Sequence, residues 1–312
     1  MGSSVAVLAL LGAFLSAAGD RPPGAPPDTL LIDEEGDSVW FRRGDSPALR
    51  YRFDGAPFKP YVQEWYTPSG VQVLRDAPHD HLHHHAMMFA IKVDDVNFWE
   101  EREAPGAQVH RSFEGSGVAK SSQGFYARFV ERLDWVRPTG GAVLLQEART
   151  VKLHDTQGAT LLTWESRFTV PQGKDKATLG GAHYHGLGMR FVESMDTVGT
   201  FTTPGGELGE LVRGDEHLTP GAWCAYTAPV DGKMVTVAMF DSPENIRPAL
   251  WFTMKEHFAY LSATLNLWRE PIDVTPDKPL VLRYGAALWD GEVSKEAIEA
   301  TYRQWLGINA VE

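Results

Sequence analysis

The chain has 312 residues, of which 43% are hydrophobic and 22% are charged, a composition typical of a globular protein with a sizeable core. Its 41 acidic and 29 basic residues give a net charge of −12, which argues against nucleic acid or an anionic membrane surface as a partner. Thirty glycines, twenty prolines and 11% aromatic residues favour turns and strands over a helical bundle. The single cysteine, Cys224, excludes an intramolecular disulfide and lies in an apolar segment typical of a buried, inert thiol.

The N-terminal residues 1–19 have the features of a signal peptide. Residues 5–15 are apolar, and the small residues 16–19 suit cleavage by signal peptidase. The run is shorter than the roughly twenty apolar residues that span a bilayer. No lysine or arginine precedes it, which departs from the usual pattern, and no cysteine follows it as a lipid attachment site. We expect an exported protein, periplasmic or extracellular, without an integral membrane span, and a Pro-rich linker over residues 20–37.

From residue 38 onward the sequence predicts strands at short intervals. Residues 49–53 alternate apolar and basic side chains, and runs at 124–133, 143–154 and 160–170 are joined by glycine-containing turns, as in antiparallel hairpins. Further strands are expected at 234–240, 258–263 and 280–289. One helix is expected at 294–306, because Ser294 suits an N-cap, Gly307 suits a C-terminal stop, and Ile298, Tyr302 and Trp305 form an apolar stripe. No repeat or composition break divides residues 38–312. The prediction is one all-β domain, a large antiparallel β-sandwich with a C-terminal helix.

A histidine-rich run lies in residues 79–85, which hold five of the eleven histidines. It leads directly into residues 86–91, which read as a buried strand. On an extended strand, His81, His83 and His85 would share one face and His84 would point to the other. Imidazole is the commonest metal ligand and titrates near neutral pH, so the run predicts a functional site. An exposed polar loop that is rich in histidine is the alternative.

The same spacing recurs at His183 and His185, a hundred residues further on. Two such pairs on adjoining strands would make His81, His83, His183 and His185 the ligands of one divalent metal ion or a set of acid–base catalysts. Glu193 and Glu100 are candidate oxygen ligands. Gly186 and Gly188 then allow close approach of a ligand or of another strand. His110, His154, His217 and His257 stand alone and are expected to make ordinary hydrogen bonds.

Other residue types suggest where a substrate could bind. Arg190 and Arg283 each interrupt an apolar strand, and an arginine fork suits hydroxyl or carboxylate groups. Trp99, Trp251 and Trp268 lie near polar clusters, where an aromatic ring could pack on a sugar. The charged residues Glu147, Arg149, Glu165 and Arg167 are expected on the solvated side of their strands. No P-loop, dinucleotide fingerprint, nucleophile elbow or paired-cysteine zinc motif occurs, so no nucleotide cofactor is expected.

Three segments resemble a known family. Asp80-His81-Leu82-His83-His84, with Phe89-Ala90 and Asn97-Phe98-Trp99 after it, resembles the Asp-His-Pro-His-His-Arg-Gly-Leu…Phe-Trp segment of a bacterial secreted family. That family is labelled methane oxygenase PmoA or a domain of unknown function. Residues 240–248 and Trp251 resemble its Asp-x-Pro-x-Asn-Pro-Arg-x-Pro…Trp motif, and residues 282–291 with the helix are similar to its closing element. Leu82, His85 and Ile246 depart from the family pattern, which has Pro, Arg and Pro there. The resemblance covers about residues 45–307.

The resemblance implies an exported all-β sandwich found among proteins that accompany carbohydrate breakdown. By fold-level analogy it implies a galactose-mutarotase-like supersandwich. Its motifs complete the set of expected substrate-binding residues, namely His84, Trp99, Arg190, Asn245, Arg247, Trp251 and Arg283. We expect a carbohydrate-active lyase, epimerase or hydrolase that acts on a sugar or modified glycoside by His-assisted acid–base chemistry, with one divalent metal ion as an expected cofactor. A non-catalytic glycan-binding protein is the first alternative, and a copper or iron oxygenase, as the family label suggests, is the second.

Overall fold

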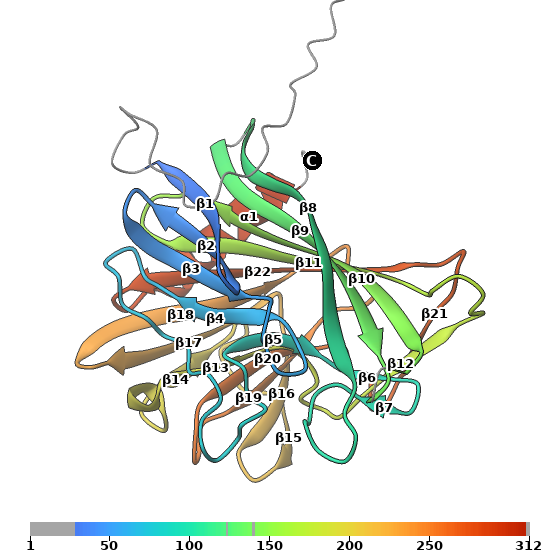
Figure 1. Ribbon diagram of the computed structural model, residues 1–312. Helices are drawn as coiled ribbons and strands as arrows, with labels where there is room; N and C mark the ends of the chain where they lie inside the picture. Colours follow the sequence, from blue (N-terminus) through green and yellow to red (C-terminus); the bar gives the residue numbers. More distant parts are fainter. Residues whose placement is uncertain (1–28, 123, 139–140, 310–312) are drawn as a thin grey trace, which may run out of the picture.

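The computed structural model describes residues 29–122, 124–138 and 141–309 of the chain. Antiparallel strands dominate it, and the one α-helix in this part of the chain is C-terminal, so the prediction of an all-β sandwich with a closing helix is confirmed (Figure 1). The largest sheet has ten strands, in the order β1 (Leu30–Glu35), β2 (Ser38–Arg43), β3 (Ser46–Arg52), β4 (Tyr61–Trp65), β5 (Met87–Ala90), β13 (Gly186–Arg190), β20 (Tyr260–Thr264), β19 (Leu250–Met254), β16 (Glu216–Pro220) and β15 (Glu210–Arg213).

Two further sheets complete the fold. The second sheet has eight strands, in the order β14 (Thr200–Thr202), β17 (Trp223–Val230), β18 (Lys233–Asp241), β22 (Leu280–Asp290), β11 (Thr160–Thr169), β10 (Val143–His154), β9 (Gly124–Val136) and β8 (Ala107–Ser121). A small third sheet has the order β21 (Ile272–Val274), β12 (Ala177–Gly180), β6 (Lys92–Val93) and β7 (Val96–Asn97). A short 3-10 helix, η2 (Glu193–Met195), follows β13.

The ten-stranded and eight-stranded sheets pack face to face and enclose the core. Phe89 of β5 contacts Trp135 of β9 and Phe168 of β11, with ring centroids 6.2 and 5.5 Å apart. Successive side chains of a strand point to opposite faces, so the residues paired with Phe89 across the sheet also face this core. These are Leu187, Ala263 and Trp251. Their neighbours Gly188, Ser262 and Phe252 therefore belong to the outer face of the same sheet.

The core between the two sheets also holds charged residues. Glu147 and Arg149 of β10 face inward, form an ion pair of 2.8 Å, and have fully buried side chains. Glu165 and Arg167 of β11 lie on the other face, where Glu165 pairs with Arg283 of β22. The prediction that all four would be solvated is therefore wrong for Glu147 and Arg149. Their position follows from strand alternation, which places them on the same face as the buried Val151 and Leu153.

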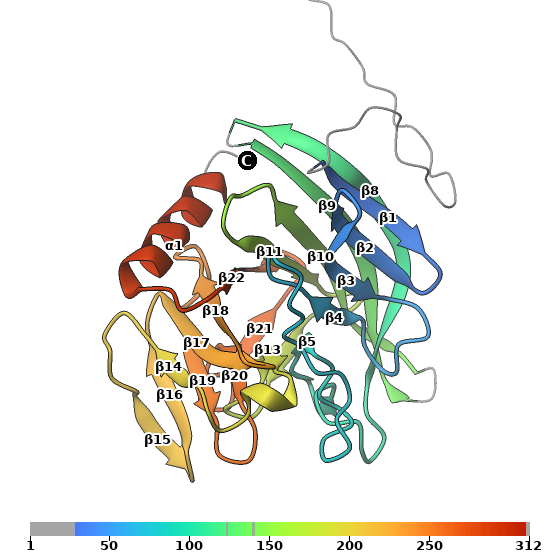
Figure 2. The ribbon, with the colours of Figure 1, turned by 90° about the vertical axis from the view of Figure 1, so that its left-hand side faces the viewer.

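The C-terminal helix, α1 (Lys295–Asn309), covers part of the outer face of the eight-stranded sheet (Figure 2). The Ser294 hydroxyl accepts a hydrogen bond from the backbone N–H of Ala297, as an N-cap does. Trp305 is fully buried, packs on Phe240 and donates a hydrogen bond to Thr163. The helix passes the expected stop at Gly307 because Ile308 is buried in the same apolar cluster. Burial of that side chain outweighs the low helix propensity of one glycine.

Gly285 of β22 makes room for this helix. A Cβ atom at this position would lie 2.6 Å from the Trp305 ring and 2.9 Å from the Phe240 ring. We expect Gly285→Ala to lower the free energy of unfolding by about 1–3 kcal/mol, because overpacking displaces the buried ring. Urea unfolding measures the loss, and Gly180→Ala is the control because nothing lies within 4 Å of the added Cβ there. Equal stability of the two variants would contradict the prediction.

The N-terminal predictions have different outcomes. The predicted signal peptide, residues 1–19, lies outside the described residues. The linker was predicted to extend to residue 37, but Leu30–Glu35 forms strand β1 and pairs with β2. Leu30 is buried there, so this segment contributes to the core rather than joining two parts of the chain. No helix within the described ranges is both long and apolar enough to cross a membrane.

Candidate functional site

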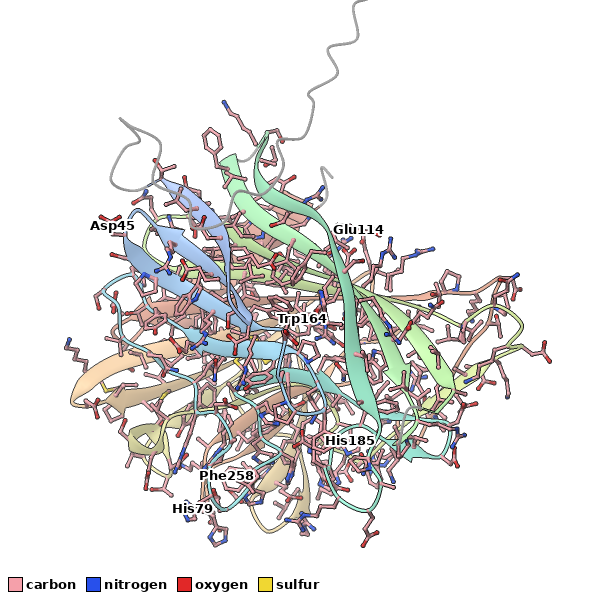
Figure 3. All side chains as sticks on the ribbon, in the orientation of Figure 1. Asp45, His79, Glu114, Trp164, His185 and Phe258 are labelled. Atoms are coloured by element: carbon pink, nitrogen blue, oxygen red, sulfur yellow. The ribbon has the colours of Figure 1, made fainter. Side chains whose placement is uncertain are left out.

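A cavity of about 950 Å³ lies on the outer face of the ten-stranded sheet. Phe252, Met254 and Tyr260 reach it from β19 and β20 because each lies on the outward side of its strand. In the view of Figure 3, His79, Phe258 and His185 lie toward the lower end of the molecule, and Trp164 of the core lies near the centre. The remaining lining residues come from the connecting loops. They are Asp80, His81, His83, His84, Lys92, Asn97, Trp99, Glu100, Arg102, Glu103, Tyr184, Arg213, Gly214, Asp215, Glu216, Glu256, His257 and Phe258.

The histidine-rich run reaches the cavity as a pair of turns and not as a strand. The backbone N–H of His81 donates to Pro78, and that of His84 donates to His81, each at 2.9 Å. The N–H of Ala77 closes the loop by donating to the carbonyl of His84, also at 2.9 Å. Strand β5 begins only at Met87. The predicted strand face shared by His81, His83 and His85 is therefore wrong.

The turns gather three imidazole rings at the cavity. His81 and His84 are three residues apart and stack, with ring centroids 4.6 Å apart and planes at 20°. His83 meets His84 edge-on at 4.6 Å and His81 at 5.7 Å. On a strand, His84 would have pointed away from its neighbours, whereas the turns place it beside them. The outcome is a compact group of three histidines, with His85 excluded from it.

His81 has the geometry of a general base with an orienting carboxylate. Its Nδ1 atom lies 3.0 Å from Asp80 Oδ2. Burial raises the pKa of Asp80, but the hydrogen bond from His81 and the charge of Arg190, 4.0 Å away, lower it overall. An ionised carboxylate only accepts, so His81 Nδ1 carries the hydrogen and the basic Nε2 atom is left to accept a proton. This pairing holds the ring in one tautomer, as in catalytic base–carboxylate pairs.

The imidazole rings of His83 and His84 are uncharged at neutral pH and make no hydrogen bond to the described side chains and backbone. Burial, helped by the nearby His81, lowers the pKa of His83 to about 4. Burial lowers the pKa of His84 still further, and its Nδ1 atom is buried without a partner. A neutral imidazole can both donate and accept a hydrogen bond. Two such rings beside His81 are thus suited to bind hydroxyl groups.

Backbone strain is concentrated around the cavity. Ten non-glycine residues in the described ranges have positive φ, and five of them belong to its loops: Ala77, Ala86, Glu103, Ala104 and His257. Ala77 and Ala86, with φ of 42° and 43°, flank the histidine-rich turns. Such conformations cost of order 1–3 kcal/mol each and persist mainly where the surroundings over-determine them, as at functional sites. The positive φ values are thus a second reason, separate from the histidines, to regard these loops as the candidate functional site.

The second histidine pair does not join the first. His183 and His185 also lie in a turn, before β13, and His185 stacks on Trp99 with ring centroids 5.0 Å apart. Trp99 lies between the two groups, because its ring also contacts His84, with centroids 6.5 Å apart. His183 Nε2 is 2.7 Å from Glu216, so this nitrogen is already occupied. Burial lowers the pKa of His185 to about 3, and neither of its ring nitrogens has a hydrogen-bond partner among the residues that the structure describes.

These positions do not fit the predicted four-histidine metal centre. Over residues 29–309, apart from the gaps at 123 and 139–140, no three His, Cys, Asp or Glu side chains are grouped so that they could hold a metal ion. Glu193, the candidate oxygen ligand, is 80% exposed and pairs with Arg75. We therefore derive no chemical step through a metal. Binding of a divalent ion stays a prediction for metal analysis of the purified protein.

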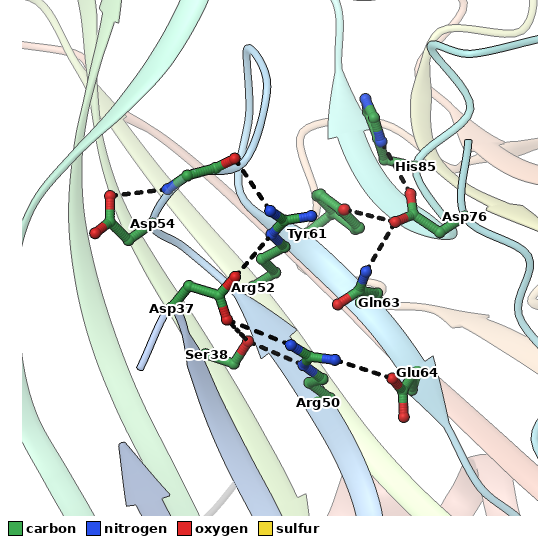
Figure 4. Close-up of polar contacts among 11 residues, drawn as sticks. Asp37, Ser38, Arg50, Arg52, Asp54, Tyr61, Gln63, Glu64, Asp76 and His85 are labelled. Carbon is green, nitrogen blue, oxygen red and sulfur yellow. Dashed lines mark hydrogen bonds and ion pairs between the residues drawn. The ribbon is translucent and has the colours of Figure 1, made fainter. Parts of the chain in front are cut away.

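His85 points instead into a buried polar network. Its Nδ1 atom is 3.0 Å from Asp76, and its Nε2 atom is 2.9 Å from Glu101. Asp76 also accepts hydrogen bonds from Tyr61 and Gln63 (Figure 4). Glu101 in turn pairs with the buried Lys59. Both ring nitrogens face carboxylates, so both must donate, and the ring is an imidazolium. His85 thereby joins the two loops that carry the cavity residues.

The charge of His85 predicts a pH dependence of stability. Burial lowers its pKa, but the hydrogen bonds to Asp76 and Glu101 raise it overall above the ordinary value of 6.5. A raised pKa in the folded state means that the stabilisation is complete below pH 6.5 and is lost as the pH rises through the folded pKa. We expect the stability advantage of the wild type over His85→Gln to shrink as the pH rises above the ordinary histidine pKa of 6.5. Urea unfolding at each pH tests this, with the exposed His79→Gln as control. An advantage that is constant with pH would contradict it.

Several cavity residues were not singled out from the sequence. Asn97 accepts hydrogen bonds from the backbone N–H groups of Trp99 and Glu100, and so shapes the loop that presents them. Tyr184 donates to one oxygen of Glu100 at 2.8 Å, and Asn97 donates to the other at 2.7 Å. Asp80 and Tyr184 are next to histidines of the two pairs in the sequence. Their positions could therefore have identified them as candidate site residues. Tyr260, Phe258 and His257 carried no such signal.

Most of the predicted substrate-binding residues lie elsewhere. Arg190 is buried behind the site, where its guanidinium stacks on Phe258 at 3.9 Å and pairs with Asp196. Trp99 lines the cavity, but it is only 1% exposed and offers little ring surface. The predicted residues of the second family motif and of β22 contact other parts of the protein and do not line the cavity. Asn245 bonds Asp241 and the Arg283 backbone, Arg247 pairs with Glu270, Arg283 pairs with Glu165 and Glu244, and Trp251 donates to Gly221 in the core.

Solved structures with a similar fold include the following two. The α-galactosidase from Lactobacillus brevis superposes with a TM-score of 0.52 at 7% identity, over 88% of this chain and 42% of the galactosidase chain. A putative mutarotase from Salmonella typhimurium superposes with a TM-score of 0.41 at 11% identity, over 84% of this chain and 94% of that one. At these identities the likeness is one of fold. This chain spans about two-fifths of the length of the galactosidase.

A family model matches most of the sequence and so shows the family of this chain. The chain belongs to a family of unknown function, DUF6807, whose model matches residues 38–303. No curated protein matches the sequence. The methane oxygenase label of the family that the motifs resemble finds no support in these comparisons.

Proposed function

We propose that the protein is an exported carbohydrate-active enzyme that acts on a sugar or modified glycoside by His-assisted acid–base chemistry. The observation that carries the proposal is the His81–Asp80 pair, which opens into a cavity of about 950 Å³ beside two uncharged imidazoles. His81 Nε2 would remove or return a proton next to an activated carbon of the substrate, while Asp80 stabilises the imidazolium that forms. Lyase, epimerase and hydrolase reactions can all begin with this step.

The rest of the lining supports a sugar as the substrate. Glu100 is held in place by Tyr184 and Asn97, which leaves acceptor capacity on its oxygens for sugar hydroxyl groups. Tyr184, which is only partly buried, supplies aromatic surface for the apolar face of a sugar ring. The resemblance to an α-galactosidase adds support by analogy of fold alone.

A substrate screen tests the proposal. Purified, tag-free protein is incubated with a panel of mono- and oligosaccharide glycosides, and both binding and product formation are measured. Turnover that is lost in His81→Ala while binding persists would support the enzyme. Binding without turnover would make the protein a glycan-binding module, and neither binding nor turnover would reject both roles. Stoichiometric copper or iron that is lost in His81→Ala would favour the oxygenase alternative.

A further inference from the structure

Two buried polar groups without hydrogen-bond partners lie at the floor of the cavity. Tyr260 and His84 both line it and are 3% and 7% exposed. The Tyr260 hydroxyl and His84 Nδ1 are buried, and neither has a hydrogen-bond partner within the described part of the chain. The ring centroids of Tyr260 and His84 lie 5.2 Å apart, so the two side chains are neighbours. A buried polar group without a partner destabilises a folded protein, and a functional role explains why it is kept.

The sheet is built to accommodate the Tyr260 hydroxyl. It lies over Gly188 of β13, where a Cβ atom would come within 2.1 Å of the hydroxyl oxygen. Gly188 was expected to allow close approach of a ligand or of another strand. In the structure it leaves room for the Tyr260 side chain. The space made by this glycine is filled by a hydroxyl that has no hydrogen-bond partner in the described part of the chain. A bound ligand or a buried water is the remaining source of a partner.

The floor is uncharged, and the charges lie around it. Burial keeps His83 and His84 neutral and raises the pKa of Tyr260 well above its ordinary value. Six carboxylates line the cavity against three cations, and of the cations Arg213 is already paired with Glu216. Of the arginines that the sequence offered for a carboxylate, Arg247 and Arg283 pair with acidic residues outside the cavity, and Arg190 pairs with Asp196 and lies 4.0 Å from Asp80. The other two cations of the lining, Lys92 and Arg102, are exposed and do not belong to the buried floor. An anionic ligand would therefore meet a lining of net negative charge and no cation at the floor.

We propose that the floor formed by His83, His84 and Tyr260 is a subsite for the hydroxyl groups of a neutral sugar and discriminates against uronic acids. A sugar hydroxyl both donates and accepts hydrogen bonds, as the neutral imidazoles and the tyrosine do. It can therefore form hydrogen bonds with these groups without bringing a charge into a buried site. The inference rests on the proposed function and names its substrate class.

Tyr260→Phe is expected to change the melting temperature and the sugar affinity in opposite directions. Removing only the unpaired hydroxyl should raise the melting temperature, by roughly 2–4 °C for a chain of this size. The same variant should bind the neutral sugar about three- to tenfold more weakly, because one hydrogen bond to the ligand is lost. Tyr284→Phe is the matched control, since the Tyr284 hydroxyl is also buried without a partner but lies outside the cavity, in β22. It should raise the melting temperature and leave affinity unchanged.

The ligands are methyl hexopyranosides of D-gluco, D-galacto and D-manno configuration and the matching methyl uronosides, titrated calorimetrically at pH 7. The wild type should bind at least one neutral hexoside about tenfold or more tighter than its uronoside. Equal or tighter binding of the uronoside overturns the inference, as does unchanged affinity in Tyr260→Phe, which would mean that a buried water or nothing meets the hydroxyl. Failure of every sugar to bind overturns the proposed function and this inference together.

Discussion

Arg149→Met is expected to lower the free energy of unfolding by about 3–5 kcal/mol, because it leaves buried carboxylates without their cation. The five N–H groups of the Arg149 guanidinium are all used. They donate to both oxygens of Glu147, to the Tyr51 hydroxyl, to Gln108 and to the carbonyl of Pro60, over distances of 2.7–3.0 Å. The guanidinium also stacks on Trp164 at 4.7 Å. Few single changes remove so many buried contacts.

The network around Arg149 explains why a methionine of similar length cannot replace it. Glu147 also accepts hydrogen bonds from Trp135 and Ser166, and the Tyr51 hydroxyl donates in turn to the buried Glu131. Burial raises the pKa of Glu131, although Arg149 and His110 lower it in part. Without the arginine, both carboxylates must be protonated or remain charged in the core, and either outcome costs free energy.

Urea unfolding at pH 7 measures this prediction. Arg149→Lys should recover only part of the loss, because an ammonium has three donors in place of five. Arg111→Met is the control, since Arg111 makes a single 2.7 Å ion pair with Asp134 and is half exposed. The control should change stability by less than about 1 kcal/mol. A loss in Arg149→Met no larger than that of the control would refute the role assigned to the network.

His81→Ala should reduce kcat/KM for the substrate found in the sugar screen by about 10²–10⁴-fold, the usual contribution of a general base. The loss should fall mainly on kcat, because the ring acts on the reacting proton while other groups hold the sugar. Asp80→Asn should also reduce kcat, since an amide cannot stabilise the imidazolium and can present an N–H to the ring and favour the wrong tautomer. Both variants should melt near the wild-type temperature, because His81 and Asp80 are each about one-third exposed.

His79→Ala is the matched control for these two variants. His79 belongs to the same run, is exposed, and lies outside the cavity lining. Its removal should leave kcat and KM unchanged. Wild-type kinetics in His81→Ala would remove His81 from the mechanism, and a loss of the same size in His79→Ala would show that the turns matter as a whole and that no single imidazole is the base.

Much of the fold could be predicted because its determinants are local. Alternation along 143–154 and 160–170, with glycine-containing turns between them, predicts a hairpin whose strands, β10 and β11, pair in register from Gln146 to His154. The stripe of Ile298, Tyr302 and Trp305 predicts the closing helix. Such periods fix which side chains share a face. They do not show which of the two faces is buried, so Glu147 and Arg149 were expected in solvent.

The location of the candidate site could be predicted from the sequence, but the arrangement of its residues could not. The density of histidines and the apolar strand after them mark the location, and His81, His83 and His84 do line one cavity. Their arrangement depends on two turns closed by Ala77 and Ala86 with positive φ, a conformation that alanine rarely adopts and that no local pattern predicts. The spacing shared by the two histidine pairs suggested one metal centre, whereas Trp99 lies between them.

The sequence by itself determined the antiparallel β architecture, the closing helix and the segment that carries the histidines, because these follow from side-chain period, capping and composition along the chain. Only the tertiary structure decided which histidines meet, that His85 leaves them for Asp76 and Glu101, and that Tyr260 and Glu100 join the cavity from distant segments. The physical reason is that contacts between distant segments depend on sheet order and loop closure, and neither is written in the spacing of residues within one segment.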